Sequence, residues 1–418
     1  MSKKVTATIL FVDIMDSMEI ANYWSDKKYN DFLNEFQWMM LTQIELEGKK
    51  GITDVKIVGD ELAVFYSSRD IAADIVRAID LANELKVRWY TSDTNLKRVK
   101  EEKKIIDLGV GINTGSVVLD QRPFIKKLGN LVHRRKTFEG LAISVAKRIE
   151  GLSREGKYSR IMVGHRTMAE LGKLYHDYEF ESMGLHKFKG MSQSIPIFEL
   201  KSCHSFWATI WAEHKDLNWA IKQLERTRVY DPTNIWLLMN LIDVYSNKKD
   251  YKKVEELCRE AIVIDNSVSN IYYELGSSLD EQRKYEDALD CYERAIKLKW
   301  NDWYSYVSKS ACLIFLGRYD ECIKTCECAI VSLPIGLREH FSWCFHYNMA
   351  AAYARRGDDN KALANVKKAV GYGGKEVIKS LKKDKDGDFC NLYENSQFKE
   401  ILKGEQKKQG KDRRKRRR

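Results

Sequence analysis

The chain has 418 residues, of which 44% are hydrophobic and 31% charged, and its formal net charge is +11. This length suits two or three domains, and no apolar run is long enough for a transmembrane segment. The first residues, 1–5, lack a signal-peptide core, so we expect a cytoplasmic protein. From Lys407 onward, nine basic residues and one aspartate carry +8 of the net charge, which argues against a nucleic-acid-binding surface on the rest of the chain.

Two hydrophobic runs rich in β-branched residues each end at an aspartate. Residues 5–12 (VTATILFV) precede Asp13, and residues 55–59 (VKIVG) precede Asp60. Such runs favour strands, so each carboxylate is expected where a strand stops. Together the two carboxylates could hold a pair of Mg²⁺ ions, which suits displacement at phosphorus because the metals neutralise the attacking and leaving oxygens. For either aspartate alone, a solvated loop residue is the preferred interpretation.

Further segments follow in a recognisable order. They are residues 109–115 (GVGINTG), 137–140 (TFEG), 144–150 (SVAKRIE), and 185–190 (LHKFKG) with 196–200 (PIFEL). Together with the two aspartate-ending runs, this series resembles the class III nucleotide cyclase domain, the family of adenylate and guanylate cyclases. The resemblance covers about residues 5–200. It implies an α+β fold with a βαββαβ sheet and helices, and active sites shared across a head-to-tail homodimer.

The resemblance also implies how the domain would bind its substrate, a nucleoside triphosphate. Asp13, Ile14 and Asp60 match the metal positions, which hold two divalent ions per site, Mg²⁺ or Mn²⁺. The residues from Ile14 onward match the segment that wraps the triphosphate, and the helix that follows suits an anion. Lys56 and Thr137 match the pair that reads the nucleobase.

Three more positions match residues that act on the phosphates. Arg148 matches the arginine that stabilises transition-state charge. Ser144 stands at the family's asparagine position four residues earlier, and serine can still donate one hydrogen bond. Lys189 matches a lysine that touches the outer phosphates. In a homodimer, the metal aspartates of one chain would face Lys56, Thr137 and Arg148 of the other.

One departure from the family lies just after the first aspartate. Asp16 stands where many members have a glycine. A third carboxylate beside the triphosphate would repel it unless the side chain has another role. Because aspartate is a strong N-cap residue and a helix-like stretch follows, we expect Asp16 to cap that helix.

The nucleobase stays open at this point. Lys56 donates and Thr137 both donates and accepts, which fits adenine and also uracil or cytosine. Guanine is disfavoured, because guanylate cyclases usually carry a glutamate at the Lys56 position. A compact cyclase fused to helical repeats resembles the pyrimidine cyclases of the bacterial Pycsar anti-phage systems, which make cyclic UMP or cyclic CMP for a toxic effector. We therefore favour UTP or CTP, with ATP as the alternative; an inactive cyclase fold acting as scaffold or sensor is an alternative of another class.

A second pattern follows residue 200. Tyrosines recur with a spacing of 34, and so do alanines: Tyr251, Tyr285 and Tyr319, and Ala261, Ala295 and Ala329. This period is the signature of tetratricopeptide repeats, which stack helix–turn–helix units. A degenerate unit is expected over residues 207–232 and a further one over 341–370. Such an array offers a surface for a peptide or protein ligand.

We therefore expect four segments. Residues 1–200 form the cyclase domain, residues 201–372 an all-α tetratricopeptide-repeat solenoid, residues 373–404 a C-terminal helical cap, and residues 405–418 a basic disordered tail. All nine cysteines follow residue 200 without zinc-ligand spacing, so free thiols in a reducing compartment are expected.

Overall fold

The structure is a computed structural model. It describes residues 2–46, 51–90, 92–120, 126–128, 131–133, 137–172, 178–189, 191–203, 217–228, 232–333, 338–384 and 387–403. The chain divides into two compact units, one of residues 1–250 with 263–265 and the other of residues 251–262 with 266–418. The basic tail predicted over residues 405–418 lies outside the described residues. The domain boundaries expected from the sequence stay predictions.

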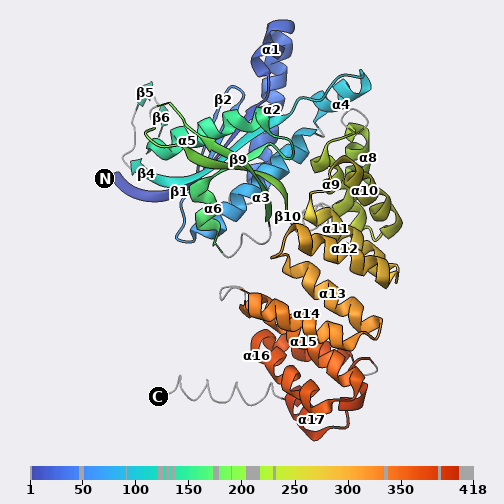
Figure 1. The fold of residues 1–418 in the computed structure, drawn as a ribbon. Coiled ribbons are helices and arrows are strands. Elements are labelled where there is room, and N and C mark those ends of the chain that lie inside the picture. The colour runs from blue at the N-terminus through green and yellow to red at the C-terminus, as the bar shows by residue number, and fades with distance from the viewer. Residues whose placement is uncertain are drawn as a thin grey trace. The chain divides into compact units, whose positions relative to one another are not determined.

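An eight-stranded mixed sheet forms the centre of the first unit (Figure 1). Its strands are β1 (Ser2–Ile14), β2 (Ile52–Val58), β3 (Glu61–Tyr66), β4 (Leu108–Asp120), β7 (Thr137–Glu139), β8 (Ile161–Gly164), β9 (Tyr178–His186) and β10 (Ile195–Cys203). They lie in the order β2-β3-β1-β4-β8-β10-β9, with β7 paired to β4. Only β4 and β8 run parallel among the described pairs. The short strands β5 (Lys126–Leu128) and β6 (Leu131–His133) form a separate pair.

Helices connect these strands. They are α1 (Ser17–Tyr23), α2 (Asp26–Leu46), α3 (Ile71–Tyr90), α4 (Asp93–Lys100), α5 (Leu141–Gly151), α6 (His165–Leu171), α8 (Leu217–Arg228) and α9 (Ile235–Asn247), with a 3₁₀ turn η1 (Leu152–Glu155). The order β1, α1–α2, β2, β3, α3, β4 confirms the expected βαββαβ arrangement. Both α3 and α5 pack against β1 and β4, where Ile9, Leu10 and Val12 are fully buried.

Two glycines explain how closely α5 lies on the sheet. A Cβ added at Gly111 would come within 2.5 Å of the Ala146 carbonyl oxygen, and one at Gly115 within 2.5 Å of the Ala142 Cβ. Real side chains do not tolerate such approaches, so the glycine-rich run on β4 is required for the helix to dock. The motif therefore sets the position of α5 and of the polar side chains that it carries.

The second unit is helical. Its helices are α10 (Tyr251–Ile264), which crosses the unit boundary, α11 (Ser269–Glu281), α12 (Tyr285–Leu298), α13 (Trp303–Phe315), α14 (Tyr319–Ser332), α15 (Arg338–Arg356), α16 (Asp359–Lys383), a 3₁₀ turn η4 (Cys390–Leu392) and α17 (Ser396–Lys403). The tyrosines spaced by 34 open α10, α12 and α14, and the matching alanines are at most 1% exposed. These placements confirm the helical-repeat interpretation.

The structure also bears on the predicted repeat unit, the boundary at residue 373, the cysteines and the membrane-spanning segments. Half of the degenerate unit predicted over residues 207–232 lies outside the described residues, and α8 forms most of the described half. Helix α16 runs across the boundary predicted at residue 373 and leaves helical geometry at Gly374, where φ is 56°. The eight cysteines from Cys258 onward are free thiols. Among the described residues, no helix is long and apolar enough to cross a membrane.

Candidate active site

Asp13 and Asp60 lie at neighbouring strand ends. Asp13 is the second-last residue of β1 and pairs in register with Glu61, the first residue of β3. Asp60 lies in the two-residue turn that joins β2 to β3, after Gly59 with φ 62°. A left-handed residue suits such a tight hairpin turn, and Gln37 Nε2 holds it by donating to the Gly59 carbonyl at 2.8 Å. The hairpin thus brings Asp60 beside Asp13.

The electrostatics around Asp13 fit a cation. Burial raises the pKa of Asp13 above its usual value, and the nearby Asp60 and Glu61 carboxylates raise it further, while Lys147 lowers it. Asp13 Oδ1 is buried and has no hydrogen-bond partner among the described residues. An unpaired buried carboxylate oxygen beside further carboxylates is a suitable donor for Mg²⁺ or Mn²⁺. Asp13 and Asp60, with Ile14 adjacent on the backbone, therefore fit the expected metal site.

Hydrogen bonds from α1 and α2 orient Asp60. Ser17 Oγ at the start of α1 donates to Asp60 Oδ2, and Tyr29 on α2 is hydrogen-bonded to Ser17. Burial raises the pKa of Tyr29, and the Asp60 charge adds to that increase. Sequence reasoning did not identify Ser17 or Tyr29, because their contact with Asp60 depends on how α1 and α2 return toward the hairpin.

Lys147 was also missed. It lies on α5 one residue before Arg148, and its ammonium is 2.5 Å from Glu61 Oε2 and 3.3 Å from both Asp13 Oδ2 and Glu150 Oε2. Burial alone would lower the pKa of Lys147, but these carboxylates raise it above its usual value. The i,i+3 pairing with Glu150 was readable from the sequence. The contacts of Lys147 with Asp13 and Glu61 could not be predicted from the sequence.

The two expected base-reading positions approach the same part of the sheet. Lys56 is on β2, and its ammonium is 5.2 Å from the centroid of the Phe65 ring on β3. Phe65 stacks on Phe138 with ring centroids 4.7 Å apart. Thr137 precedes Phe138 and is the first residue of β7, paired with Asp120. The stacked rings therefore bring β7 close to β3, and β3 is paired with β2, the strand that carries Lys56.

The remaining expected residues lie on other elements. Ser144 is exposed on α5, and Lys189 is exposed after β9. Arg148 on α5 is half-buried, and its Nη1 is buried without a hydrogen-bond partner among the described residues. Within the described part of one chain, no hydrogen bond or ion pair joins Arg148 to Asp13 or Asp60. The structure of one chain therefore brings Asp13 and Asp60 together but leaves Arg148 apart from them.

The predicted role of Asp16 is wrong. Asp16 occupies the N-cap position of α1, but its side chain makes no capping hydrogen bond and instead lies 3.5 Å from Arg154 Nε. Its φ of 59° is left-handed, a conformation that glycine adopts without strain and aspartate tolerates. The left-handed backbone at Asp16 would also suit a glycine, and it does not depend on a side-chain cap.

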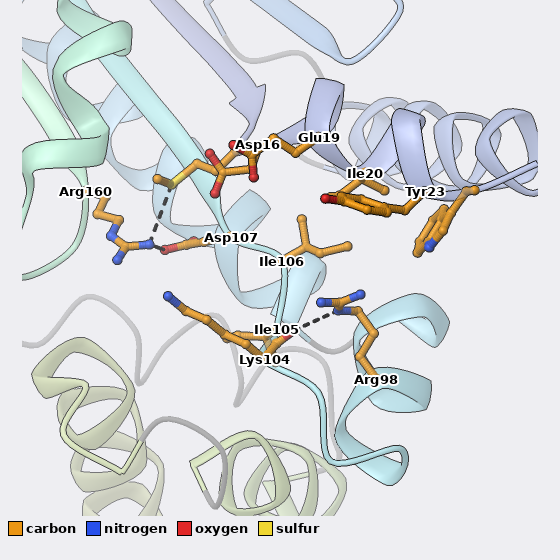
Figure 2. A pocket seen from close by; sticks show the side chains of 12 residues that line it. Asp16, Glu19, Ile20, Tyr23, Arg98, Lys104, Ile105, Ile106, Asp107 and Arg160 are labelled. Atoms are coloured by element: carbon orange, nitrogen blue, oxygen red, sulfur yellow. Dashed lines mark hydrogen bonds and ion pairs between the residues drawn. The ribbon is translucent and has the colours of Figure 1, made fainter.

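A cavity of about 290 Å³ opens beside this segment (Figure 2). Asp16 and Glu19 lie on one side of it, and Arg98 and Lys104 lie on the other. Arg98 donates from Nε to the Lys104 carbonyl at 2.7 Å, which fixes that wall. Acidic and basic side chains are balanced around the cavity, so its lining favours no single ligand charge.

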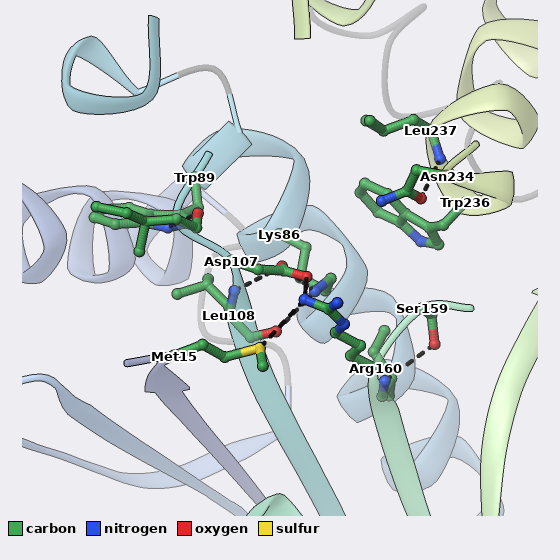
Figure 3. Close-up of polar contacts among 12 residues, drawn as sticks. Met15, Lys86, Trp89, Asp107, Leu108, Ser159, Arg160, Asn234, Trp236 and Leu237 are labelled. Carbon is green, nitrogen blue, oxygen red and sulfur yellow. Dashed lines mark hydrogen bonds and ion pairs between the residues drawn. The ribbon is translucent and has the colours of Figure 1, made fainter. Parts of the chain in front are cut away.

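A buried ion cluster anchors the chain just beyond Asp13 (Figure 3). Lys86 on α3 is 1% exposed and donates to Asp107 Oδ1 at 2.5 Å and to the Leu108 carbonyl at 2.7 Å. Arg160 Nη1 donates to Asp107 Oδ2 at 2.9 Å and lies 3.6 Å from the Met15 sulfur. Met15 N donates to the Asp107 carbonyl at 3.0 Å. The cluster therefore fixes the residues that follow Asp13.

Two family models match parts of the chain. The family model described as "Adenylate and Guanylate cyclase catalytic domain" matches residues 1–202, and the one described as "Tetratricopeptide repeat" matches residues 269–299. Among solved structures, the adenylyl cyclase CyaB from P. aeruginosa is 20% identical with a TM-score of 0.40, covering 49% of this chain and 97% of that one. The guanylyl cyclase Cya2 is 19% identical with a TM-score of 0.39, over 49% and 96%.

A helical relative matches the other part of the chain. YrrB, a tetratricopeptide protein with an unusual peptide-binding site, is 22% identical with a TM-score of 0.35, covering 42% of this chain and 88% of that one. The family assignment rests on the two family models. Residues 1–202 belong to the adenylate and guanylate cyclase catalytic domain family, which makes the protein a nucleotide cyclase, and the helical part contains a tetratricopeptide repeat.

Proposed function

We propose that the protein converts a nucleoside triphosphate into a 3′,5′-cyclic nucleotide and pyrophosphate. The 3′-hydroxyl oxygen forms a bond to the α-phosphorus, the bond from the α-phosphorus to the bridging oxygen breaks, and the hydroxyl proton passes to solvent. The observation that carries this proposal is the pair Asp13 and Asp60, with the unpaired buried oxygen of Asp13. Ring closure within one nucleotide needs chiefly positioning and charge neutralisation.

We assign metal binding to Asp13, Ile14 and Asp60. Two divalent ions bound there would activate the 3′-hydroxyl and neutralise the triphosphate. Ser17 keeps Asp60 oriented by hydrogen bonding to it. The ion cluster around Asp107 holds Met15, so the backbone that would wrap the triphosphate is fixed before substrate arrives.

The other assigned residues act on the base and the phosphates. Lys56 and Thr137 would hydrogen-bond the base edge. Arg148 would stabilise the charge that develops on the phosphoryl group, and Ser144 would donate one hydrogen bond to it. Lys189 would contact the outer phosphates. Guanidinium and ammonium groups suit these roles because they form charge-assisted hydrogen bonds with phosphate oxygens.

We further propose that the active sites are shared across a homodimer. Arg148 makes no described contact with the metal aspartates of its own chain, so a second chain is needed to supply it. Large apolar side chains are exposed on three elements of this unit: Met18 on α1, Val58 at the end of β2, and Leu141 at the start of α5 are 73%, 72% and 61% exposed. Exposed apolar side chains of this kind fit surfaces that a partner covers.

Mixing two inactive variants tests the shared site. Asp60→Ala and Arg148→Ala chains, each inactive alone, should regain about one quarter of wild-type activity after random mixing, because half of the dimers are mixed and each has one intact site. The measurement is cyclic-nucleotide formation after co-refolding or co-expression. A tagged pull-down must show that mixed dimers form. Mixed dimers without recovered activity would contradict the shared arrangement.

For the substrate, we favour UTP or CTP and a role in bacterial anti-phage signalling through a cyclic-nucleotide-binding effector. The support is the architecture, a cyclase domain joined to helical repeats. The pair Lys56 and Thr137 does not add to it, because by itself this pair slightly favours adenine and is also compatible with a pyrimidine. An adenylate cyclase is the alternative. We propose a cytoplasmic location, where nucleoside triphosphates are found, and a peptide or protein ligand for the repeats.

A product assay distinguishes the pyrimidine substrates from ATP, and an active enzyme from an inactive scaffold or sensor. Purified protein is incubated with ATP, GTP, CTP and UTP in parallel, with Mg²⁺ or Mn²⁺, and the products are separated by chromatography. We expect cyclic UMP or cyclic CMP to dominate. Dominant cyclic AMP would show that Lys56 and Thr137 read adenine. No product from any nucleotide would overturn the enzymatic proposal in favour of a scaffold or sensor.

A further inference from the structure

We propose that Lys147 is a built-in counter-ion of the metal site, which a divalent cation must displace in order to bind. The inference rests on the proposed function, because it takes Asp13 and Asp60 as the metal ligands. It concerns a residue that neither the sequence motifs nor the family assignment point to. Its basis is the contacts of Lys147 on α5 with two carboxylates that pair in register, Asp13 on β1 and Glu61 on β3.

The Lys147 ammonium lies where several carboxylates converge. Its Nζ is 2.5 Å from Glu61 Oε2, 3.3 Å from Asp13 Oδ2 and 3.3 Å from Glu150 Oε2. The Asp60 charge also acts on Asp13. Three carboxylates therefore surround the Lys147 ammonium, and a fourth lies near Asp13, a charge imbalance that would be costly without Lys147 and that also favours a divalent ion.

Lys147 and a metal ion compete for the same oxygens. An ion bound to Asp13 would lie within a few ångströms of the Lys147 ammonium, where like charges repel strongly in a partly buried site. The lysine side chain is 39% exposed, whereas the Glu150 side chain is only 3% exposed. A flexible, partly exposed lysine can swing toward solvent, while the buried glutamate stays in place. Loading the site with metal therefore requires Lys147 to give up its bond to Asp13.

The packing of α5 on the sheet brings Lys147 to these carboxylates. Because Gly111 and Gly115 allow the helix to lie directly on β4, the Lys147 side chain reaches across to the end of β1. Its ammonium also lies 5.9 Å from the centroid of the Phe11 ring, which adds a weak attraction. Lys147 is thus a positioning residue. By competing with the metal ion for the carboxylate oxygens, it raises the metal concentration that is needed to fill the site.

Metal binding to the full-length protein tests the proposal directly. Titration of Mn²⁺ followed by electron paramagnetic resonance measures the dissociation constant without any turnover. Lys147→Met keeps the apolar stem and removes the charge, so the dissociation constant should fall about tenfold. Lys147→Arg keeps the charge and should stay close to wild type. Lys103→Met removes a lysine that pairs with Glu101 at an exposed position, and it should leave Mn²⁺ affinity unchanged.

Thermal unfolding gives a second readout that a purely structural role would not reproduce. Without metal, Lys147→Met should unfold at a lower temperature than wild type, because its carboxylates lose their counter-ion. Saturating Mn²⁺ should raise the melting temperature more in the variant than in wild type, since the metal replaces the missing charge and binds more tightly. A structural defect alone would lower both melting temperatures equally.

The outcomes separate this inference from the proposed function. An unchanged Mn²⁺ dissociation constant in Lys147→Met, with Asp60→Ala abolishing Mn²⁺ binding, would overturn the counter-ion role and leave the metal site intact. Weaker Mn²⁺ binding in Lys147→Met would also overturn it. If Asp60→Ala binds Mn²⁺ as wild type does, the metal assignment itself fails, and the counter-ion role fails with it.

Discussion

Replacing Asp60 by alanine is expected to lower the rate of cyclic-nucleotide formation about a thousandfold or more, because metal charge stabilisation is worth several kcal/mol and each 1.36 kcal/mol changes a rate tenfold. The fold should survive. Asp60 lies in a hairpin turn, is only partly buried, and among the described residues makes one side-chain hydrogen bond, from Ser17. Steady-state turnover with Mg²⁺ and Mn²⁺, together with circular dichroism, measures both effects.

A matched carboxylate elsewhere in the same unit controls for the loss of negative charge. Glu101→Ala removes an exposed acid that pairs with Lys103, and it should leave turnover unchanged. High Mn²⁺ concentration should not restore the Asp60→Ala variant, because the ligand itself is missing. Turnover close to wild type in Asp60→Ala would mean that the metal ligands lie elsewhere.

The parts of the fold that depend on local pattern were predictable. The β-branched runs before Asp13 and Asp60 form β1 and β2, because strand preference and the Gly59-Asp60 turn are both encoded within a few residues. The 34-residue period predicted helix–turn–helix units, and its tyrosines are the first residues of α10, α12 and α14. In these helices the aromatic and small residues pack against neighbouring helices; a side chain at Gly276, for example, would come within 2.7 Å of the Tyr292 ring.

The parts that depend on register and packing were not predictable. Glu61 meets Asp13 only through the pairing of β3 with β1, and Lys147 reaches them only because glycines bring α5 onto β4. Asp16 illustrates the same limit, because its residue type suits a helix cap while its left-handed backbone turns the side chain toward Arg154. Contacts between segments distant in sequence decide the details of the site.

Breaking the buried ion pair between Lys86 and Asp107 is expected to have the largest effect on stability. Asp107→Asn leaves the Lys86 ammonium, which is 1% exposed, without its counter-charge, and such a loss typically costs about 3–5 kcal/mol. Burial lowers the pKa of Lys86, so part of this cost is relieved by loss of its proton. In calorimetry, we expect the transition of the first unit to fall by about 10 °C.

A double-mutant cycle separates pairing from packing. Lys86→Met alone leaves Asp107 with Arg160 at 2.9 Å, so it should destabilise less than Asp107→Asn. The double variant should lose less stability than the sum of the single variants, by about 1–3 kcal/mol, because both charges are then removed together. Additive effects would contradict the pairing. Lys103→Met with Glu101→Gln, an exposed pair, should leave the transition unchanged.

The same cluster links stability to the active site. Asp107 has a pKa below its usual value, since Lys86 and Arg160 outweigh the opposing effect of burial. Its contribution to stability is therefore present above the unfolded pKa of about 3.9 and is lost as pH falls through the lower folded pKa. Because Met15 hydrogen-bonds to the Asp107 backbone and lies beside Arg160, Asp107→Asn should also lower cyclase turnover at temperatures well below unfolding. The buried charges thus hold in place the residues that follow Asp13.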